Sequence, residues 1–119
     1  MGRVDDRNRG LIDIEVRRAR DARGTNVTVW IDTAFDGHLV FPKSLIEKLD
    51  LESLVETEAV LADGRKVVLE TFLCHLDWFG NSIPLQVIAN DGKMPLLGTG
   101  LLEEHILHVD YRTKQVTLE

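Results

Sequence analysis

Apolar and polar residues alternate along two early segments of the chain, and this period of two is typical of strands with one buried face. Residues 10–16 alternate aliphatic with acidic side chains, and residues 27–31 place Val29 and Ile31 on one face. Arg, Gly and Asn residues separate the two segments, as they do in turns. The pattern therefore predicts a β-hairpin whose second strand ends at Asp32.

The middle of the chain predicts a short helix followed by a long hairpin. In residues 42–51, leucine and isoleucine recur at helical spacing behind Pro42, which suits the first turn of a helix. Residues 54–78 contain two stretches rich in β-formers on either side of Asp63 and Gly64, a dipeptide that tolerates positive φ in tight turns. We expect two long antiparallel strands here.

The last third of the chain predicts short elements only. Residues 83–89 have the composition of a strand, the apolar group 94–105 has the length of a helix, and residues 106–119 contain two short strands around the polar turn 112–114. The pattern predicts about eight strands and two short helices in one domain over residues 1–119. That is an all-β, mainly antiparallel fold.

The composition is that of an ordinary globular domain, since 44% of the 119 residues are hydrophobic and 29% are charged. No apolar run approaches the roughly 20 residues of a membrane helix, and the charged N-terminal segment lacks the apolar stretch of a secretory signal. A net charge of -6 repels nucleic acid, and the one basic cluster, residues 17–23, is interrupted by Asp21. The single Cys74 cannot form an internal disulfide. We expect a cytoplasmic protein that binds neither membranes nor nucleic acid.

Two short motifs, one early and one late, carry the clearest chemical signal. Residues 31–37 read IDTAFDG and continue through GHLVFP, and residues 95–102 read PLLGTGLL. In this order and spacing the motifs resemble those of the retropepsin-like aspartic proteases, in particular small single-lobe bacterial and archaeal members. The resemblance implies a single closed β-barrel lobe with one or two short helices, an aspartate-based active site, and no cofactor or metal.

The early motif supplies most of the site residues that the resemblance implies. It makes Asp32 the catalytic carboxylate and Thr33 the hydroxyl that binds the backbone of a partner chain beneath the active site. It places Ala34 against the substrate. Asp36 and Gly37 follow on the substrate-binding side of the same loop.

Two other segments acquire roles from the same resemblance. Asp63 and Gly64 would form the tip of a hairpin flap over the substrate. Leu96, Leu97 and Gly98 would pack behind the catalytic loop and support it.

One carboxylate cannot activate water and protonate a carbonyl oxygen in the same step, whereas two can. Two carboxyl groups about 3 Å apart share one proton, so that one acts as base and the other as acid. A chain with a single Asp-Thr-Ala motif must obtain the second carboxylate from a second copy across a twofold axis. We therefore expect a homodimeric endopeptidase that hydrolyses a peptide or protein with water held between the two copies of Asp32.

The sequence departs from the family pattern at two places. Ala34 stands where the family usually has glycine, a residue that permits close backbone approach and positive φ. Thr99 and Gly100 stand where retroviral members usually carry Arg followed by Asp or Asn, which removes the usual cationic partner of the acid at Asp36. We therefore expect Asp36 to cap the following turn. The departures leave an alternative function open, namely a catalytically inactive dimer that binds peptides or a protein partner.

Several of these residues also have a purely structural interpretation. An Asp after a strand, such as Asp32, is often a turn former because its side chain accepts hydrogen bonds from nearby backbone N–H groups. Cys74 lies in an apolar stretch and is expected to be a buried core thiol. Trp30 and Trp78 are expected to be core residues, with packing at a dimer contact as the alternative.

The four histidines lack the spacing of a metal site. Only two of them lie three residues apart, and these two are expected on different elements. We therefore expect no zinc at His38, His75, His105 and His108.

Overall fold

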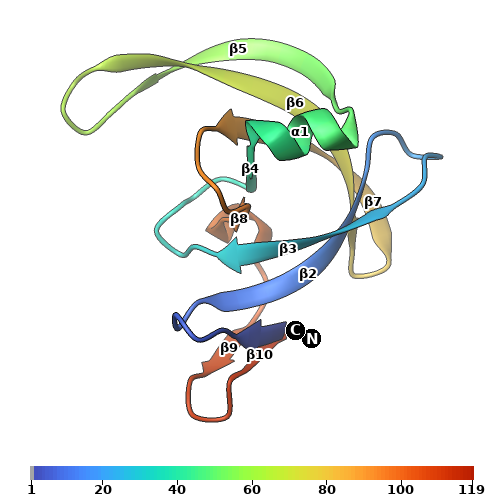
Figure 1. The fold of residues 1–119 in the computed structure, drawn as a ribbon, viewed down its shortest axis with the longest axis vertical. Coiled ribbons are helices and arrows are strands. Elements are labelled where there is room, and N and C mark those ends of the chain that lie inside the picture. The colour runs from blue at the N-terminus through green and yellow to red at the C-terminus, as the bar shows by residue number, and fades with distance from the viewer. Residues whose placement is uncertain (1) are drawn as a thin grey trace.

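The computed structural model describes residues 2–119, apart from the side chains at positions 57 and 59. Figure 1 shows the chain as a curved sheet with one helix beside it. The elements in chain order are β1 (Gly2–Val4), β2 (Gly10–Arg17), β3 (Thr25–Ile31), β4 (Leu39–Pro42), α1 (Lys43–Leu49), β5 (Glu52–Val60), β6 (Lys66–Trp78), β7 (Asn81–Asn90), β8 (Leu96–Leu97), the 3-10 turn η1 (Thr99–Leu101), β9 (Leu107–Asp110) and β10 (Gln115–Leu118).

Six of the strands close into a barrel. Successive pairings run from β2 through β3, β8, β4 and β7 to β6. β6 then pairs again with β2, where residues 15–17 lie opposite residues 75–77. Closure satisfies the strand edges that an open sheet would leave free. The predicted closed β-barrel is therefore confirmed. It is mainly antiparallel, although the pairs β3–β8 and β4–β7 are parallel.

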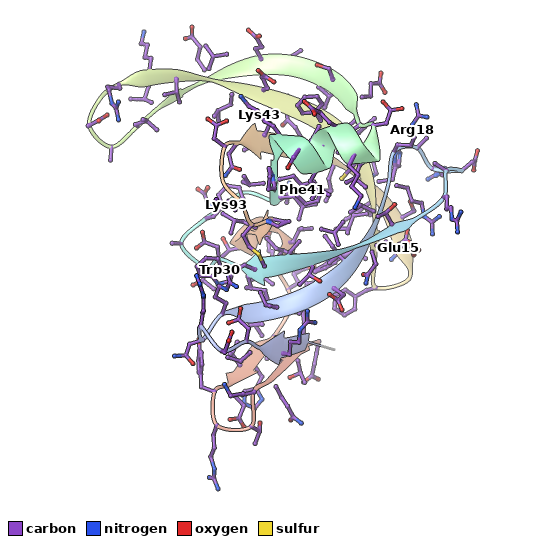
Figure 2. The ribbon with its side chains drawn as sticks, viewed as in Figure 1. Glu15, Arg18, Trp30, Phe41, Lys43 and Lys93 are labelled. Carbon is purple, nitrogen blue, oxygen red and sulfur yellow. The ribbon has the colours of Figure 1, made fainter. Side chains whose placement is uncertain are left out.

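Aliphatic side chains at alternate positions fill the barrel. Val29 of β3 is 0% exposed, and Phe41 of β4 is equally buried inside the barrel (Figure 2). All four residues of β4 are buried because α1 covers its outer face through Ile46. The expectation for Cys74 is confirmed: the thiol is buried in the core, and burial raises its pKa to about 12.

The long hairpin predicted around Asp63 and Gly64 is confirmed as β5 and β6. In its turn the Leu61 N–H donates a hydrogen bond to the Arg65 C=O at 2.8 Å, and Gly64 has a φ of 86° that glycine adopts without strain. Figure 1 shows this hairpin reaching past α1, toward the side of the molecule where the loop after β3 turns.

The prediction of a helix over residues 94–105 is wrong. Leu96 and Leu97 instead form β8, which inserts between β3 and β4, and only the short η1 follows. Leu97 is 0% exposed at the centre of this arrangement. A strand of two residues is too short to show an alternating pattern. The prediction was wrong because Leu96 and Leu97, together with Leu101 and Leu102, have the spacing of apolar residues on one face of a helix.

Ten strands are present among the described residues, where about eight were predicted. The N-terminal strand β1 went unpredicted because it is short and buries only Val4. It pairs antiparallel with both β2 and β10, and β9 then forms the end of the sheet. None of the helices in the described chain has the length and apolar character needed to cross a membrane.

Candidate active site

The loop at residues 32–38 presents the Asp-Thr-Ala motif where β3 ends. The Trp30 N–H donates a hydrogen bond to the Pro95 C=O, and the Asp32 N–H donates one to the Leu97 C=O, both at 2.9 Å. The parallel ladder of β3 and β8 thus continues one residue past the end of β3 and fixes the backbone at Asp32. Asp32 is half-buried in this position.

The carboxylate of Asp32 folds back on its own loop. Its Oδ1 accepts a hydrogen bond from the Ala34 N–H at 3.0 Å, and its C=O accepts one from the Phe35 N–H at 3.2 Å. These bonds make an Asx turn, so Asp32 is a turn former as its structural interpretation predicts. The second carboxylate oxygen has no hydrogen-bond partner within residues 2–119, which leaves it available to water or another group.

Thr33 and Ala34 lie exposed on the outer side of the loop. Within the described chain, the non-glycine residues with positive φ do not include Ala34. Alanine therefore occupies this position without the backbone strain that a glycine-only conformation would impose. The departure from the family pattern consists of one added methyl group.

Gly98 lets the segment after β8 pack directly against the Asp32 loop. Its N–H donates a hydrogen bond to the His38 C=O at 2.8 Å. A Cβ at this position would lie 2.7 Å from the Phe35 carbonyl oxygen and closer still to that of Gly37, distances that real Cβ atoms do not tolerate. Gly98 thus packs directly against residues 35–38 of the loop.

Phe35 supports the loop, and sequence reasoning missed it. Its carbonyl accepts hydrogen bonds from the Thr99 N–H at 2.8 Å and from the Thr99 hydroxyl at 3.3 Å. Its ring occupies the space that a Cβ atom would need at Gly37 and at Gly98. Thr99, which stands where retroviral members carry arginine, therefore binds the loop through a backbone carbonyl. The one sequence signal was a bulky apolar residue among small and polar ones.

Other predicted site residues lie farther from Asp32. Asp36 is exposed, and its carboxylate makes no hydrogen bond or ion pair inside the described part of the chain, so the expected cap does not form. Asp63 and Gly64 lie at the tip of the β5–β6 hairpin, where Asp63 binds the Arg65 guanidinium at 2.6 Å. Figure 1 shows this tip apart from the 32–38 loop.

Trp30 flanks the loop on the outer face of β3, so its prediction as a core residue is wrong. It is 37% exposed, and Figure 2 shows it near the 32–38 loop. The Arg9 guanidinium lies 5.5 Å from the ring centroid and forms a 2.7 Å ion pair with Asp5. The backbone N–H of Arg9 also binds Asp5, which holds the pKa of that carboxyl below its usual value. Trp78, in contrast, packs against the core as expected.

Asp32 lies apart from four hollows on the surface of the described chain. Four surface hollows of between about 190 and 440 Å³ lie beneath α1, beside β6 and at one end of the barrel, and Asp32 lines none of these four. Among the described residues, no three His, Cys, Asp or Glu side chains gather as metal ligands would. The chemical group that the 32–38 loop offers is the Asp32 carboxylate, held by the backbone bond to Leu97.

Comparison with known proteins gives matches in structure alone. No protein-family model matches the sequence, and no curated protein does. EIAV protease, complexed with the inhibitor HBY-793, matches with a TM-score of 0.60 and 16% identity over 84% of this chain and 90% of that chain. A retropepsin-like aspartic protease from Rickettsia conorii matches with a TM-score of 0.65 and 16% identity over 91% and 81%. Simian foamy virus (mac) protease matches with a TM-score of 0.53 and 15% identity over 77% and 92%.

Identities this low show the fold and nothing finer. The chain has a retropepsin-like fold, and the fold expectation drawn from the two motifs is confirmed.

The close packing behind the loop generates a first prediction. Gly98→Ala should lower the free energy of unfolding by about 1–3 kcal/mol, because the added methyl collides with backbone that cannot move aside. Urea denaturation measures this change. Gly10→Ala is the matched control, since its Cβ would meet nothing nearer than 3.8 Å. Equal stability of the two variants would contradict the packing described here.

Proposed function

We propose that this chain is an aspartic endopeptidase that is active as a homodimer. The observation that carries the proposal is the position of Asp32 on a loop whose backbone is fixed by Leu97. One oxygen of its carboxylate has no hydrogen-bond partner in the described chain. The aspartic proteases of similar fold support the general class, a hydrolase of peptide bonds.

The reaction needs two carboxyl groups in different protonation states. When two copies of Asp32 lie about 3 Å apart, repulsion between the charges retains one proton in the pair. The ionised carboxylate takes a proton from water as the water oxygen attacks the peptide carbonyl carbon, and the protonated carboxyl gives its proton to the carbonyl oxygen. As the C–N bond of the resulting diol breaks, the leaving nitrogen takes a proton from the dyad, and a diol hydroxyl returns one to it.

The exposed residues beside Asp32 suit a contact with a second copy. A twofold axis brings identical surfaces together, so a residue near the axis meets its own copy. Thr33 is exposed, and its hydroxyl makes no hydrogen bond within the described chain. In the dimer this hydroxyl would bind the backbone of the partner beneath the two carboxylates.

The β5–β6 hairpin supplies a cover for an extended peptide. Val60, Leu61 and Val68 near its tip are 68%, 39% and 59% exposed, more than their apolar character favours in a bare monomer. A peptide bound between the hairpin and the Asp32 loop would cover these side chains and would pair with strand edges through main-chain hydrogen bonds. Asp63 and Gly64 would then lie at the tip of the closed hairpin.

The free edge of β9 offers a surface on which two copies can join. Ile106 and Glu119 exchange two backbone hydrogen bonds, of 2.9 and 3.0 Å. Because such pairs alternate in an antiparallel ladder, the N–H and C=O groups of Leu107 and Val109 point away from β10. Pairing Leu107 of one copy with Val109 of the other would extend the sheet across the twofold axis.

A peptide-binding dimer without catalysis is the second candidate, and Ala34 is the observation that favours it. The methyl group of Ala34 is exposed beside Asp32, in the space where a substrate backbone would lie. Ala34→Gly separates the two candidates. A gain of cleavage on this substitution supports the protease, whereas unchanged peptide binding with no cleavage in either form supports the binding module.

The catalytic proposal predicts the effect of one substitution. Asp32→Asn should lower peptide cleavage by about 10³-fold or more, since the amide can neither take nor share the proton. The assay uses a mixed peptide library between pH 3 and 8 with mass-spectrometric detection. Asp21→Asn, on the exposed turn after β2, is the matched control and should cleave as the wild type does. Equal inactivity of wild type and Asp32→Asn would overturn the proposal.

The dimer proposal predicts a second effect. Val109→Pro removes an N–H group that points to the free edge and leaves the pairing with β10 intact, so the variant should fold but remain monomeric and inactive. Analytical ultracentrifugation measures the mass, and Val109→Ala controls for the lost side chain. A Val109→Pro dimer of unchanged mass would place the interface elsewhere.

A further inference from the structure

A groove of about 440 Å³ opens at one end of the barrel, and Asp32 does not line it. Its apolar floor comes from the ends of β6 and β7 and from η1. The lining residues on which the argument rests are Trp78, Ile83, Leu85, Leu101, Glu103 and Glu104. We call this surface the mouth groove. Open ends of β-barrels are frequent ligand sites, because the inward-facing side chains there lack a covering layer.

Apolar side chains of the barrel interior continue outward into the mouth groove. Leu85 and Leu101 are buried, whereas Trp78 and Ile83 are only partly covered and pack on the edge of the core. A ligand with an apolar body would complete their burial. The floor of the mouth groove therefore favours an apolar side chain.

The rim of the mouth groove carries negative charge. Glu103 and Glu104 are both exposed, and neither forms an ion pair with a cation in the described part of the chain. The chain as a whole has a net charge of -6, which strengthens the local potential. Charge complementarity therefore favours a cationic group at this rim.

Two residues with positive φ lie beside the mouth groove. Glu104 has a φ of 65° and Phe79 a φ of 49°, in the left-handed region that side chains rarely adopt. The rings of Phe79 and His105 stack with their centroids 4.4 Å apart, and the ring centroids of Trp78 and His105 are 5.8 Å apart. Glycine would relieve the strain at either position. Phe79 and Gly80 form the two-residue turn between β6 and β7, a turn type that requires positive φ at both positions.

The mouth groove also adjoins the support of the Asp32 loop. Gly100 lines the groove, and its N–H donates a hydrogen bond to the Gly37 C=O at 3.0 Å. His38 lines the groove as well, and its C=O binds the Gly98 N–H. Backbone hydrogen bonds thus connect the lining of the groove to the loop that carries Asp32.

We propose that the mouth groove binds a basic, amphipathic peptide segment, in which a lysine or arginine pairs with Glu103 and Glu104 and a neighbouring apolar side chain enters the floor. In a protein substrate, this segment would lie outside the bonds that are cleaved. The role in substrate docking rests on the proposed protease function, whereas the binding itself does not.

The test measures binding of a fluorescein-labelled octapeptide of alternating leucine and lysine by anisotropy. The protein is Asp32→Asn, so that cleavage cannot interfere. Glu103→Gln combined with Glu104→Gln should weaken binding about tenfold, the effect of losing two exposed ion pairs. Asp21→Asn combined with Asp91→Asn removes the same charge elsewhere and should change binding less than about twofold. Equal weakening by both pairs would show a general charge effect and overturn the proposal.

Glu104→Gly separates a binding role of Glu104 from a structural one, because it should change stability and peptide binding in opposite directions. Relief of the positive φ should raise the melting temperature, while loss of the carboxylate weakens peptide binding. A Glu104→Gly protein that binds the peptide as tightly as its parent would overturn the proposal. Binding that depends on both glutamates, together with a wild-type protein that cleaves no peptide in the library, would overturn the proposed function and leave the mouth groove standing.

Discussion

The pairing of β8 with the end of β3 is the interaction on which the rest of this structure depends. Only two residues form β8, yet they separate β3 from β4, complete the barrel and bind the backbone of Asp32 through the Leu97 carbonyl. Asp32 therefore sits at the junction of a ladder with one buried face, formed by Ile31 and Leu97, and an exposed loop. A catalytic group needs this combination, because its position must be fixed while its reactive atom stays accessible.

Close packing behind the loop explains why glycines and one large aromatic residue lie together at this position. Gly98 and Gly37 leave no room for side chains, and the ring of Phe35 fills the space that remains. Thr99 then joins the segment to the loop through two hydrogen bonds to one carbonyl. Because this support is complete within one chain, the proposed dyad needs only a second carboxylate. Twofold symmetry is the simplest source of that group.

Local patterns allowed much of the fold to be predicted, but not its central connection. Alternation revealed β2 and β3, and Asp63 with Gly64 revealed the long hairpin, because each signal lies within a few residues of sequence. The strand β8 has no such signal, since its identity comes from partners more than 50 residues away. Trp30 was misplaced for a related reason: whether a strand face is covered depends on the tertiary neighbours. The motif around Asp32 was found only through its resemblance to a family.

A disulfide trap tests the central claim most directly, because Cys74 is buried and an added thiol at position 32 would be the reactive one. Under mild oxidation, Asp32→Cys should form a covalent dimer on a non-reducing gel, since a disulfide requires the two Cα atoms to lie within about 7 Å. Asp21→Cys, on a distant exposed turn, should not. If Asp32→Cys stays monomeric under conditions in which the unmodified protein is dimeric, the two carboxylates do not meet and the account fails.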